Sequence, residues 1–255
     1  MGRITIVKVG GKVVEETESL NSLLDQFYKI SGNKILVHGG GKSATEVANR
    51  MGIKTQMING RRITDAATLE VVTMVYGGMI NKKIVAGLQS RGINSLGLTG
   101  ADLDLIRAKK RHVGEIDYGF VGDVENVNTN ELKLLINENI TPVIAPLTHD
   151  GKGNMLNTNA DTIASELAIE LTNYFDVYLF YCFEKKGVLM NPDDENSVIH
   201  DLDFDLFTKY KENGIINTGM IPKLENGFRA KRSGVKEVLI TNPDNIANGK
   251  GTRII

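Results

Sequence analysis

Short apolar runs alternate with amphipathic stretches along most of the chain. The runs are rich in β-branched and aromatic residues and predict buried strands at 4–9, 34–38, 94–98, 141–146, 177–183 and 237–241. Between them, apolar residues recur at helical spacing, which predicts helices at 18–30, 43–51, 65–91, 131–137, 160–171 and 219–233. This order predicts βαβ units and a mainly parallel sheet.

Four more local features of the sequence lead to expectations. Residues 106–111 and 118–127 alternate in polarity and predict a β-hairpin. Asp65 is a candidate N-cap for the long helix after it. Pro222 predicts an interruption of the helix at 219–233. A new βα series starts near residue 174, which is a candidate lobe boundary.

Composition narrows the class of protein. The 255 residues include 30 Lys and Arg against 31 Asp and Glu, so we expect no nucleic-acid surface. No apolar run approaches the roughly 18 residues of a membrane span. Cys182 is the single cysteine, which excludes an internal disulfide and fits a reducing cytoplasm. The first strand begins almost at once, so no signal peptide is expected.

The first strand carries a lysine in an otherwise apolar run. Lys8 stands between Val7 and Val9, and Gly10 and Gly11 follow directly. Burying a lysine costs free energy unless an anion meets its ammonium group. Glycines let backbone amides approach such an anion closely. We therefore expect Lys8 to face a phosphate group.

A second glycine-rich turn follows the next strand. His38 is followed by Gly39, Gly40 and Gly41, and a helix begins there. Backbone amides and a helix N-terminus at such a turn favour a negative group. A tight turn without a ligand is the alternative interpretation. The turn is not a P-loop, because Leu36 stands where that motif has a glycine.

The segment 157–161 stands directly before an apolar helix. Asn157 and Asn159 offer two amides for a carboxylate, which leaves Asp161 to orient nearby cations. N-capping explains the same residue types, because Asn and Asp favour helix starts. Both interpretations stay open from these residues alone.

Two other basic features are candidates for a site. Lys223 falls in the first turn of a predicted helix, where it opposes the helix dipole. Such local conflicts occur at functional sites, although an exposed surface lysine is the alternative. Arg61 and Arg62 are adjacent, so on a strand they point to opposite faces and one suffices for a site. Arginine suits carboxylate binding.

Together these motifs resemble the amino acid kinase family, in particular its N-acetylglutamate kinase branch. The resemblance covers the whole chain and rests on the segments 8–11, 38–41, 59–64, 157–161, 219–223 and 251–254. It implies a three-layer αβα sandwich with a mainly parallel open sheet. Residues 1–173 would bind an acylated amino acid and mediate dimerisation, and residues 174–255 would bind ATP.

The implied reaction is phosphoryl transfer from ATP, with Mg²⁺ bound to the nucleotide, to the γ-carboxylate of an N-acyl-L-glutamate. This is the second step of the acetylated route to arginine. A carboxylate is already ionised near neutral pH, so no general base is required. Positioning and cations should therefore carry most of the catalysis.

The resemblance also implies roles for individual residues. Lys8 and Lys223 would stabilise the transferring phosphoryl group, and Asp161 would hold the two lysines by ion pairing. Gly10 and Gly11 would lie against the phosphates. The substrate contacts would come from Gly40, Gly41, Arg62, Asn157 and Asn159.

Two departures from the family pattern stand out. The start of the nucleotide lobe lacks the usual aspartate, and its replacement is open between Glu184 and Lys185. Arg61 stands where relatives have an apolar residue before the substrate-binding arginine. One hypothesis is that Arg61 contacts a larger, acidic acyl group such as succinyl. The alternative is that Arg61 turns outward to solvent.

Several alternatives remain beside an acylglutamate kinase. One is an amino acid kinase for glutamate, aspartate or carbamate, and another is a non-catalytic nucleotide-binding sensor of the same fold. The presence of Lys8, Asp161 and Lys223 favours an enzyme. We expect a homodimer paired through the helix at 65–91. Because the chain begins two residues before its first strand, we also expect insensitivity to arginine.

Overall fold

A large open sheet forms the centre of the molecule. The computed structural model describes residues 1–58, 61–216 and 219–255. Eight strands run in the order β12 (Asp201–Leu202), β14 (Thr252–Ile254), β13 (Glu237–Thr241), β11 (Phe175–Cys182), β1 (Gly2–Val9), β2 (Asn33–His38), β8 (Thr141–Ile144) and β5 (Ser95–Leu98). Neighbours are parallel except β13 and β14. The predicted mainly parallel sheet is confirmed.

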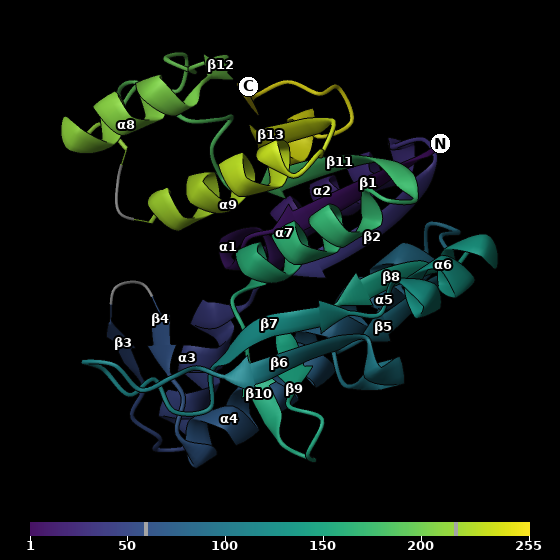
Figure 1. Cartoon of the computed structure of the whole chain (residues 1–255), viewed down its shortest axis with the longest axis vertical. Coiled ribbons are helices and arrows are strands. Elements are labelled where there is room, and N and C mark those ends of the chain that lie inside the picture. Colours follow the sequence, from purple (N-terminus) through teal and green to yellow (C-terminus); the bar gives the residue numbers. More distant parts are fainter. Residues whose placement is uncertain (59–60, 217–218) are drawn as a thin grey trace.

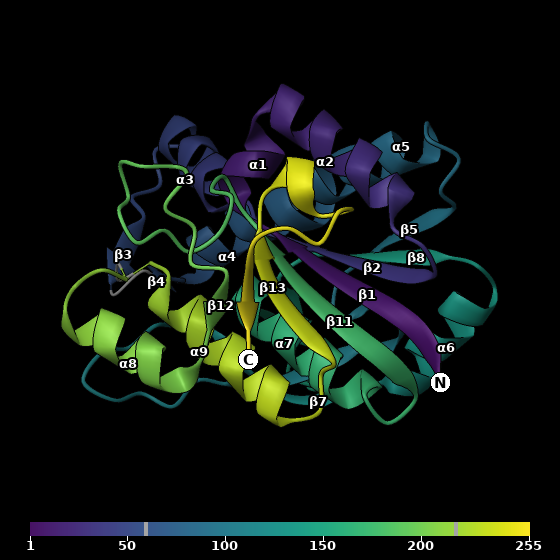
Figure 2. The ribbon, with the colours of Figure 1, turned by 90° about the horizontal axis from the view of Figure 1, so that it is seen from above.

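Helices cover both faces of this sheet, which gives three layers (Figure 2). One face carries α1 (Gly11–Glu15), α2 (Thr17–Lys29), α3 (Gly41–Arg50), α4 (Ala66–Val72) and α5 (Asn81–Gln89). The other carries α6 (Thr129–Asn137), α7 (Ala160–Leu171), α8 (Phe204–Glu212) and α9 (Ile221–Arg232). The αβα sandwich implied by the resemblance is confirmed.

The alternation of side chains along β1 sorts them between the two faces. Ile4 and Ile6 belong to the core beneath α7 and α9, whereas Val7 and Val9 belong to the core on the opposite face. Because successive strand residues point to opposite faces, Lys8 points to the same face of the sheet as Ile4 and Ile6. The sheet thus directs Lys8 toward the helices that carry the other charged site residues.

The long helix predicted at 65–91 consists of three consecutive segments. Asp65 is its N-cap, as predicted, because its carboxylate accepts a hydrogen bond from the Thr68 amide at 2.8 Å. Between α4 and α5 the chain forms a π-helical segment, η1 (Thr73–Ile80). Met74 and Met79 on this segment are exposed.

The predicted interruption of the late helix is wrong. α9 runs unbroken from Ile221 to Arg232, and Pro222 lies in its first turn. A proline is tolerated there because its missing N–H group has no partner within the helix. Its effect is to fix where α9 starts, and Lys223 is the next residue.

A smaller sheet and a short hairpin stand beside the main sheet (Figure 1). β6 (Ile106–Lys110) and β7 (Gly122–Val127) pair antiparallel as predicted, and β9 (Leu147–His149) and β10 (Met155–Asn157) extend them to four strands. β3 (Gln56–Ile58) pairs with β4 (Arg61–Ile63). Single turns of 3₁₀-helix lie at η2 (Asp102–Asp104) and η3 (Pro243–Asn245).

Backbone bonds join the short hairpin to the smaller sheet. The Thr64 amide donates to the Tyr118 carbonyl at 2.9 Å, and the Phe120 amide donates to the Thr64 carbonyl at 2.7 Å. Val121 in turn bridges to Asn157. These links place the two predicted arginines near the start of α7. Asn59 and Gly60 of the arginine motif lie outside the described residues.

Candidate active site

Two lysines meet one carboxylate at the ends of β1, α7 and α9. The Lys8 Nζ lies 2.8 Å from the Asp161 Oδ1. The Lys223 Nζ lies 3.0 Å from both oxygens of the same carboxylate. All three residues are buried. Three elements far apart in sequence therefore build one charged cluster.

The cluster has a characteristic electrostatic balance. Burial lowers the pKa of Lys8, Asp161 opposes that shift, and the neighbouring Lys223 adds to it. Burial alone would raise the pKa of Asp161, but the two ammonium groups outweigh it and the net shift is downward. Asp161 is thus held ionised between two cations, and the cluster carries one surplus positive charge when both lysines are protonated.

Two glycine-rich turns face each other beside this cluster. A Cβ atom on Gly11 would lie 3.3 Å from the Gly40 nitrogen and 3.4 Å from the Gly41 nitrogen. Among the described residues, no backbone carbonyl accepts a hydrogen bond from the amides of these three glycines. By contrast, the Gly10 amide already donates to the Cys182 carbonyl at 2.9 Å. Three amides are therefore available to an anion here.

The conformation of Gly40 restricts this position to glycine. Its φ is +154°, and a Cβ atom there would overlap the Ile80 side chain. The start of α3 is fixed separately, because Glu15 accepts hydrogen bonds from the Ser43 amide at 2.7 Å and the Ser43 hydroxyl at 3.1 Å. Glu15 thus satisfies the amide of the third residue of α3 and leaves the Gly40 and Gly41 amides to the site.

A cavity of about 220 Å³ joins these features. It brings together most of the residues predicted for the site, namely Lys8, Gly11, Gly40, Gly41, Arg61, Arg62, Asn157, Asn159 and Asp161. Lys223, which contacts Asp161, and Gly10, which precedes Gly11, are not among the described lining residues. Apolar walls come from Met57, Tyr76, Val121 and Pro146.

Arg62 is fixed within this cavity and keeps one free donor. Its Nη2 donates to the Gly41 carbonyl at 2.7 Å and to the Thr45 hydroxyl at 2.8 Å. Its Nη1 is buried without a hydrogen-bond partner among the described residues. A buried guanidinium nitrogen without an acceptor is costly, so this geometry fits an anionic ligand oxygen.

The two asparagines differ in how their side chains are used. The Asn159 Oδ1 accepts from the amides of Asp161 at 2.8 Å and Thr162 at 3.1 Å, so Asn159 is the N-cap of α7. The Asn157 Nδ2 donates to the Thr64 hydroxyl at 3.0 Å. The capping interpretation thus applies to Asn159, and both side chains still line the cavity.

Arg111 also lines the cavity and was not singled out from the sequence. It directly follows β6, in which basic and apolar residues alternate. This pattern is typical of a hairpin strand with one exposed face. Only the fold of 118–121 onto β4 and β10 turns its guanidinium inward. The local sequence carries no signal for this, because the contact depends on segments distant in the chain.

The region of the missing aspartate contains a different pair. The Glu184 carboxylate lies 2.8 Å from the Lys12 Nζ. Burial would raise the pKa of Glu184, but this ammonium holds it below its usual value. Next to it lies a smaller cavity of about 80 Å³ with apolar walls, which include Phe183, Val188, Leu189, Pro192, Ile215 and Ile216.

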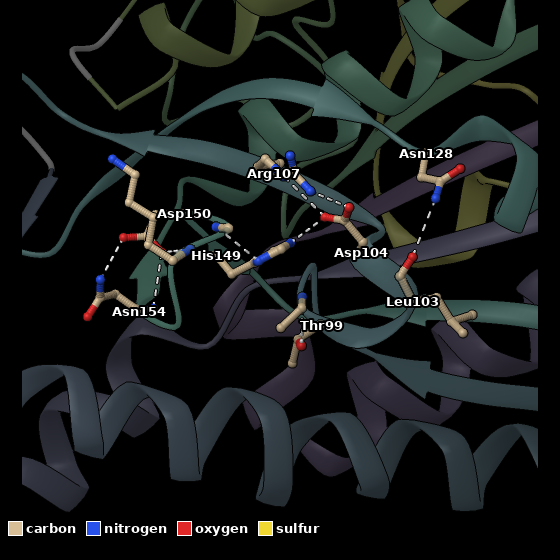
Figure 3. A network of polar contacts seen from close by, with 11 residues as sticks. Thr99, Leu103, Asp104, Arg107, Asn128, His149, Asp150 and Asn154 are labelled. Carbon is tan, nitrogen blue, oxygen red and sulfur yellow. Dashed lines mark hydrogen bonds and ion pairs between the residues drawn. The ribbon is translucent and has the colours of Figure 1, made fainter.

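A second polar cluster lies apart from the cavity (Figure 3). The Arg107 Nη2 lies 2.5 Å from Asp104, and the His149 Nε2 lies 2.8 Å from the same carboxylate. The Arg107 guanidinium foremost lowers the pKa of Asp104. These contacts join β6 to β9 at their paired residues, so the cluster anchors the strand that precedes Arg111.

Neither a metal-binding cluster nor a membrane-spanning helix is found among the described residues. They contain no group of three or more His, Cys, Asp or Glu side chains placed to hold a metal. Asp161 is the one carboxylate among the described residues that line the cavity, and both of its oxygens already bind lysines. No helix within 1–58, 61–216 and 219–255 is long and apolar enough to cross a membrane.

Comparisons with known proteins agree with this geometry. Residues 3–242 match the model of the amino acid kinase family. An acetylglutamate kinase from Parabacteroides distasonis is 59% identical over 254 residues, covering 100% of both chains. One from Methanopyrus kandleri is 39% identical, covering 97% of this chain and 98% of its own. A crystal structure of a Streptococcus mutans protein superposes with a TM-score of 0.84 at 26% identity and covers 98% of both chains.

Proposed function

This chain belongs to the amino acid kinase family, and on that premise we propose that it phosphorylates the γ-carboxylate of N-acetyl-L-glutamate with ATP. Curated relatives with that name match over the full chain. The observation that carries the proposal is the buried cluster of Lys8, Asp161 and Lys223 beside a cavity lined by glycines and arginines. The reaction belongs to arginine biosynthesis.

The cluster suits the charge that develops during phosphoryl transfer. Two anions must approach each other, so the chief requirement is positive charge that is already in place. Both ammonium groups lie within 3.0 Å of the Asp161 Oδ1. The lysines therefore need no rearrangement to stabilise the transferring group. The amides of Gly11 and Gly41 would add donors on the same side of the cavity.

Other residues that line the cavity supply contacts for the acceptor. We propose that the free Nη1 of Arg62 binds the α-carboxylate of the acylglutamate. The amides of Gly40 and Gly41 would then receive the γ-carboxylate, and the Asn157 side chain would contact the acyl amide. An ionised carboxylate is its own nucleophile, so this arrangement requires no general base.

We further propose that residues 1–173 form the acylglutamate lobe and residues 174–255 the ATP lobe. The apolar cavity bounded by Phe183, Leu189 and Ile216 fits a purine base, because such walls favour flat apolar ligands. Mg²⁺ would be held mainly by the ATP phosphates and water, a common arrangement for this ion. When bound, it would neutralise phosphate charge.

A coupled assay of ADP release tests the function directly. We expect ADP formation that requires N-acetyl-L-glutamate, with L-glutamate a poor acceptor because it lacks the acyl group. Trapping with hydroxylamine should detect the acyl phosphate. ATP binding without turnover on any acylglutamate would overturn the proposal and favour the sensor alternative.

We also propose a homodimer in the cytoplasm. The exposed Met74 and Met79 on η1 support pairing through this helix, because burying exposed apolar side chains favours association. Light scattering should give twice the mass of one chain. Met74→Glu and Met79→Glu together should shift the protein toward the monomer, whereas a wild-type monomer would refute the pairing.

A further inference from the structure

Arg111 holds an unused donor inside the candidate active site. Its Nε lies 3.1 Å and its Nη2 lies 2.5 Å from the Asp123 Oδ1, so one edge of the guanidinium is fixed. Its Nη1 is buried and has no hydrogen-bond partner among the described residues, although the side chain lines the cavity. A buried donor of this kind indicates a missing acceptor.

The backbone places Arg111 on the acceptor side of the cavity. Its amide donates to the Val121 carbonyl at 2.7 Å, and Val121 bridges to Asn157. The same segment is bonded to Thr64, which follows Arg62 closely. Arg111 therefore belongs to the wall proposed to bind the acylglutamate, away from the phosphate side formed by Lys8.

The charges that line the cavity exceed those of N-acetyl-L-glutamate. Within the described part of the chain, four basic side chains and a single carboxylate line it, and that carboxylate is occupied by the buried lysines. The α- and γ-carboxylates of the acceptor would meet Arg62 and the glycine amides. Arg61, which also lines the cavity, forms no ion pair within the described residues, and Arg111 keeps its free edge. Two arginines thus remain for another anion.

We propose that Arg111, with Arg61 at the rim, is a specificity-determining residue that binds a second carboxylate at the end of the substrate's acyl chain. Besides N-acetyl-L-glutamate, the site would then accept an N-acyl-L-glutamate with a short dicarboxylic acyl group, for which N-succinyl-L-glutamate is the simplest probe. This inference rests on the proposed function. Asp123 holds the guanidinium in place, so that the free edge is ready for the carboxylate.

Three acceptors separate carboxylate recognition from chain length. N-acetyl-L-glutamate is the short reference, N-succinyl-L-glutamate carries the additional carboxylate, and N-butanoyl-L-glutamate has the same four-carbon acyl chain without it. In the coupled assay we expect kcat/KM for the succinyl acceptor to exceed that for the butanoyl acceptor by about 10- to 100-fold. That range corresponds to a hydrogen bond to a charged group.

Variants then assign the preference to residues. Arg111→Met should reduce kcat/KM for the succinyl acceptor by a factor about 10-fold larger than its effect on kcat/KM for the acetyl acceptor. Arg107→Met is the matched control, because Arg107 also pairs with an aspartate but lies outside the cavity lining. Arg61→Met is a second variant at an exposed position, where folding is not at stake, and it should weaken the succinyl preference too.

The outcomes distinguish this inference from the proposed function. Equal kcat/KM for the succinyl and butanoyl acceptors, or an equal loss on all acceptors in Arg111→Met, overturns the inference and leaves the kinase assignment intact. If Arg111→Met does not fold, an unchanged succinyl preference in Arg61→Met overturns it. Absence of turnover with every acceptor contradicts the proposed function instead.

Discussion

Replacing Asp161 by asparagine leaves two buried ammonium groups without their shared anion. The wild-type contacts are 2.8 and 3.0 Å long. Coulomb's law at an effective dielectric of about 20 gives roughly 6 kcal/mol of gross attraction for each lysine. Most of this offsets desolvation, and removing one partner of a buried pair costs about 3–5 kcal/mol net. That is a large share of the 5–15 kcal/mol roughly typical of a folded domain.

The loss should depend on pH in a defined direction. Burial lowers the pKa of Lys8 below its unfolded value of 10.5, and Asp161 partly opposes the shift. Without that carboxylate, the pKa of Lys8 falls further. At pH values between the pKa of Lys8 in the folded chain and its pKa in the unfolded chain, the unfolded chain binds more protons. The free energy of unfolding therefore rises with pH in this range. The penalty of Asp161→Asn should therefore be largest near pH 7 and shrink toward pH 10.

Urea unfolding at pH 7 and pH 9.5 measures both effects. Asp176→Asn is a matched control, because Asp176 makes only surface pairs with Lys236 and the N-terminus. Its loss should not exceed about 1 kcal/mol at either pH. A loss for Asp161→Asn no larger than this control, or one that grows with pH, would refute the electrostatic reasoning.

Four further substitutions test other parts of the structure. Gly40→Ala should lower kcat/KM by about 100-fold in the coupled assay, because the strained turn must shift. Gly78→Ala on η1 is the control and should have little effect. Similar losses in the two variants would contradict this prediction. Arg62→Lys should raise KM for the acylglutamate about 10-fold or more, since the guanidinium fork is lost, and an unchanged KM would count against the role of Arg62. Asp65→Ala should cost about 1 kcal/mol in urea unfolding with unchanged kinetics, since only a helix cap is removed. Burial lowers the pKa of His38 to about 4, so the free energy of unfolding of the wild type should rise by up to about 3 kcal/mol between pH 4 and 6.5. In urea unfolding at several pH values, His38→Gln should lack this rise.

Local patterns predicted the main elements, because the spacing of apolar residues and the positions of turn-forming and capping residues are properties of short segments. The alternation of apolar runs gave the parallel sheet, and Asp65 was found as an N-cap from its residue type and position. Pro222 misled the prediction, since proline breaks a helix interior but suits its first turn. The π-helical segment at 73–80 has no local signal that we can identify.

Site residues could be predicted where the neighbouring sequence alone marks them. Lys8 could be singled out because a lysine inside an apolar strand requires an anion. The first anion that it meets is Asp161, which only the packing of α7 against β1 brings there. Arg111 was missed because it bonds to Val121 and Asp123, in a segment whose position depends on its backbone links to the distant residues Thr64 and Asn157. Contacts of this kind depend on tertiary structure.

The most direct measurement is the steady-state kcat of Lys8→Met with ATP and N-acetyl-L-glutamate, beside a near-ultraviolet circular dichroism spectrum that checks the fold. If Lys8 stabilises the transferring phosphoryl group, kcat should fall by about 100- to 1,000-fold while KM for the acylglutamate changes little. A folded variant whose kcat stays within about threefold of the wild type would contradict that role.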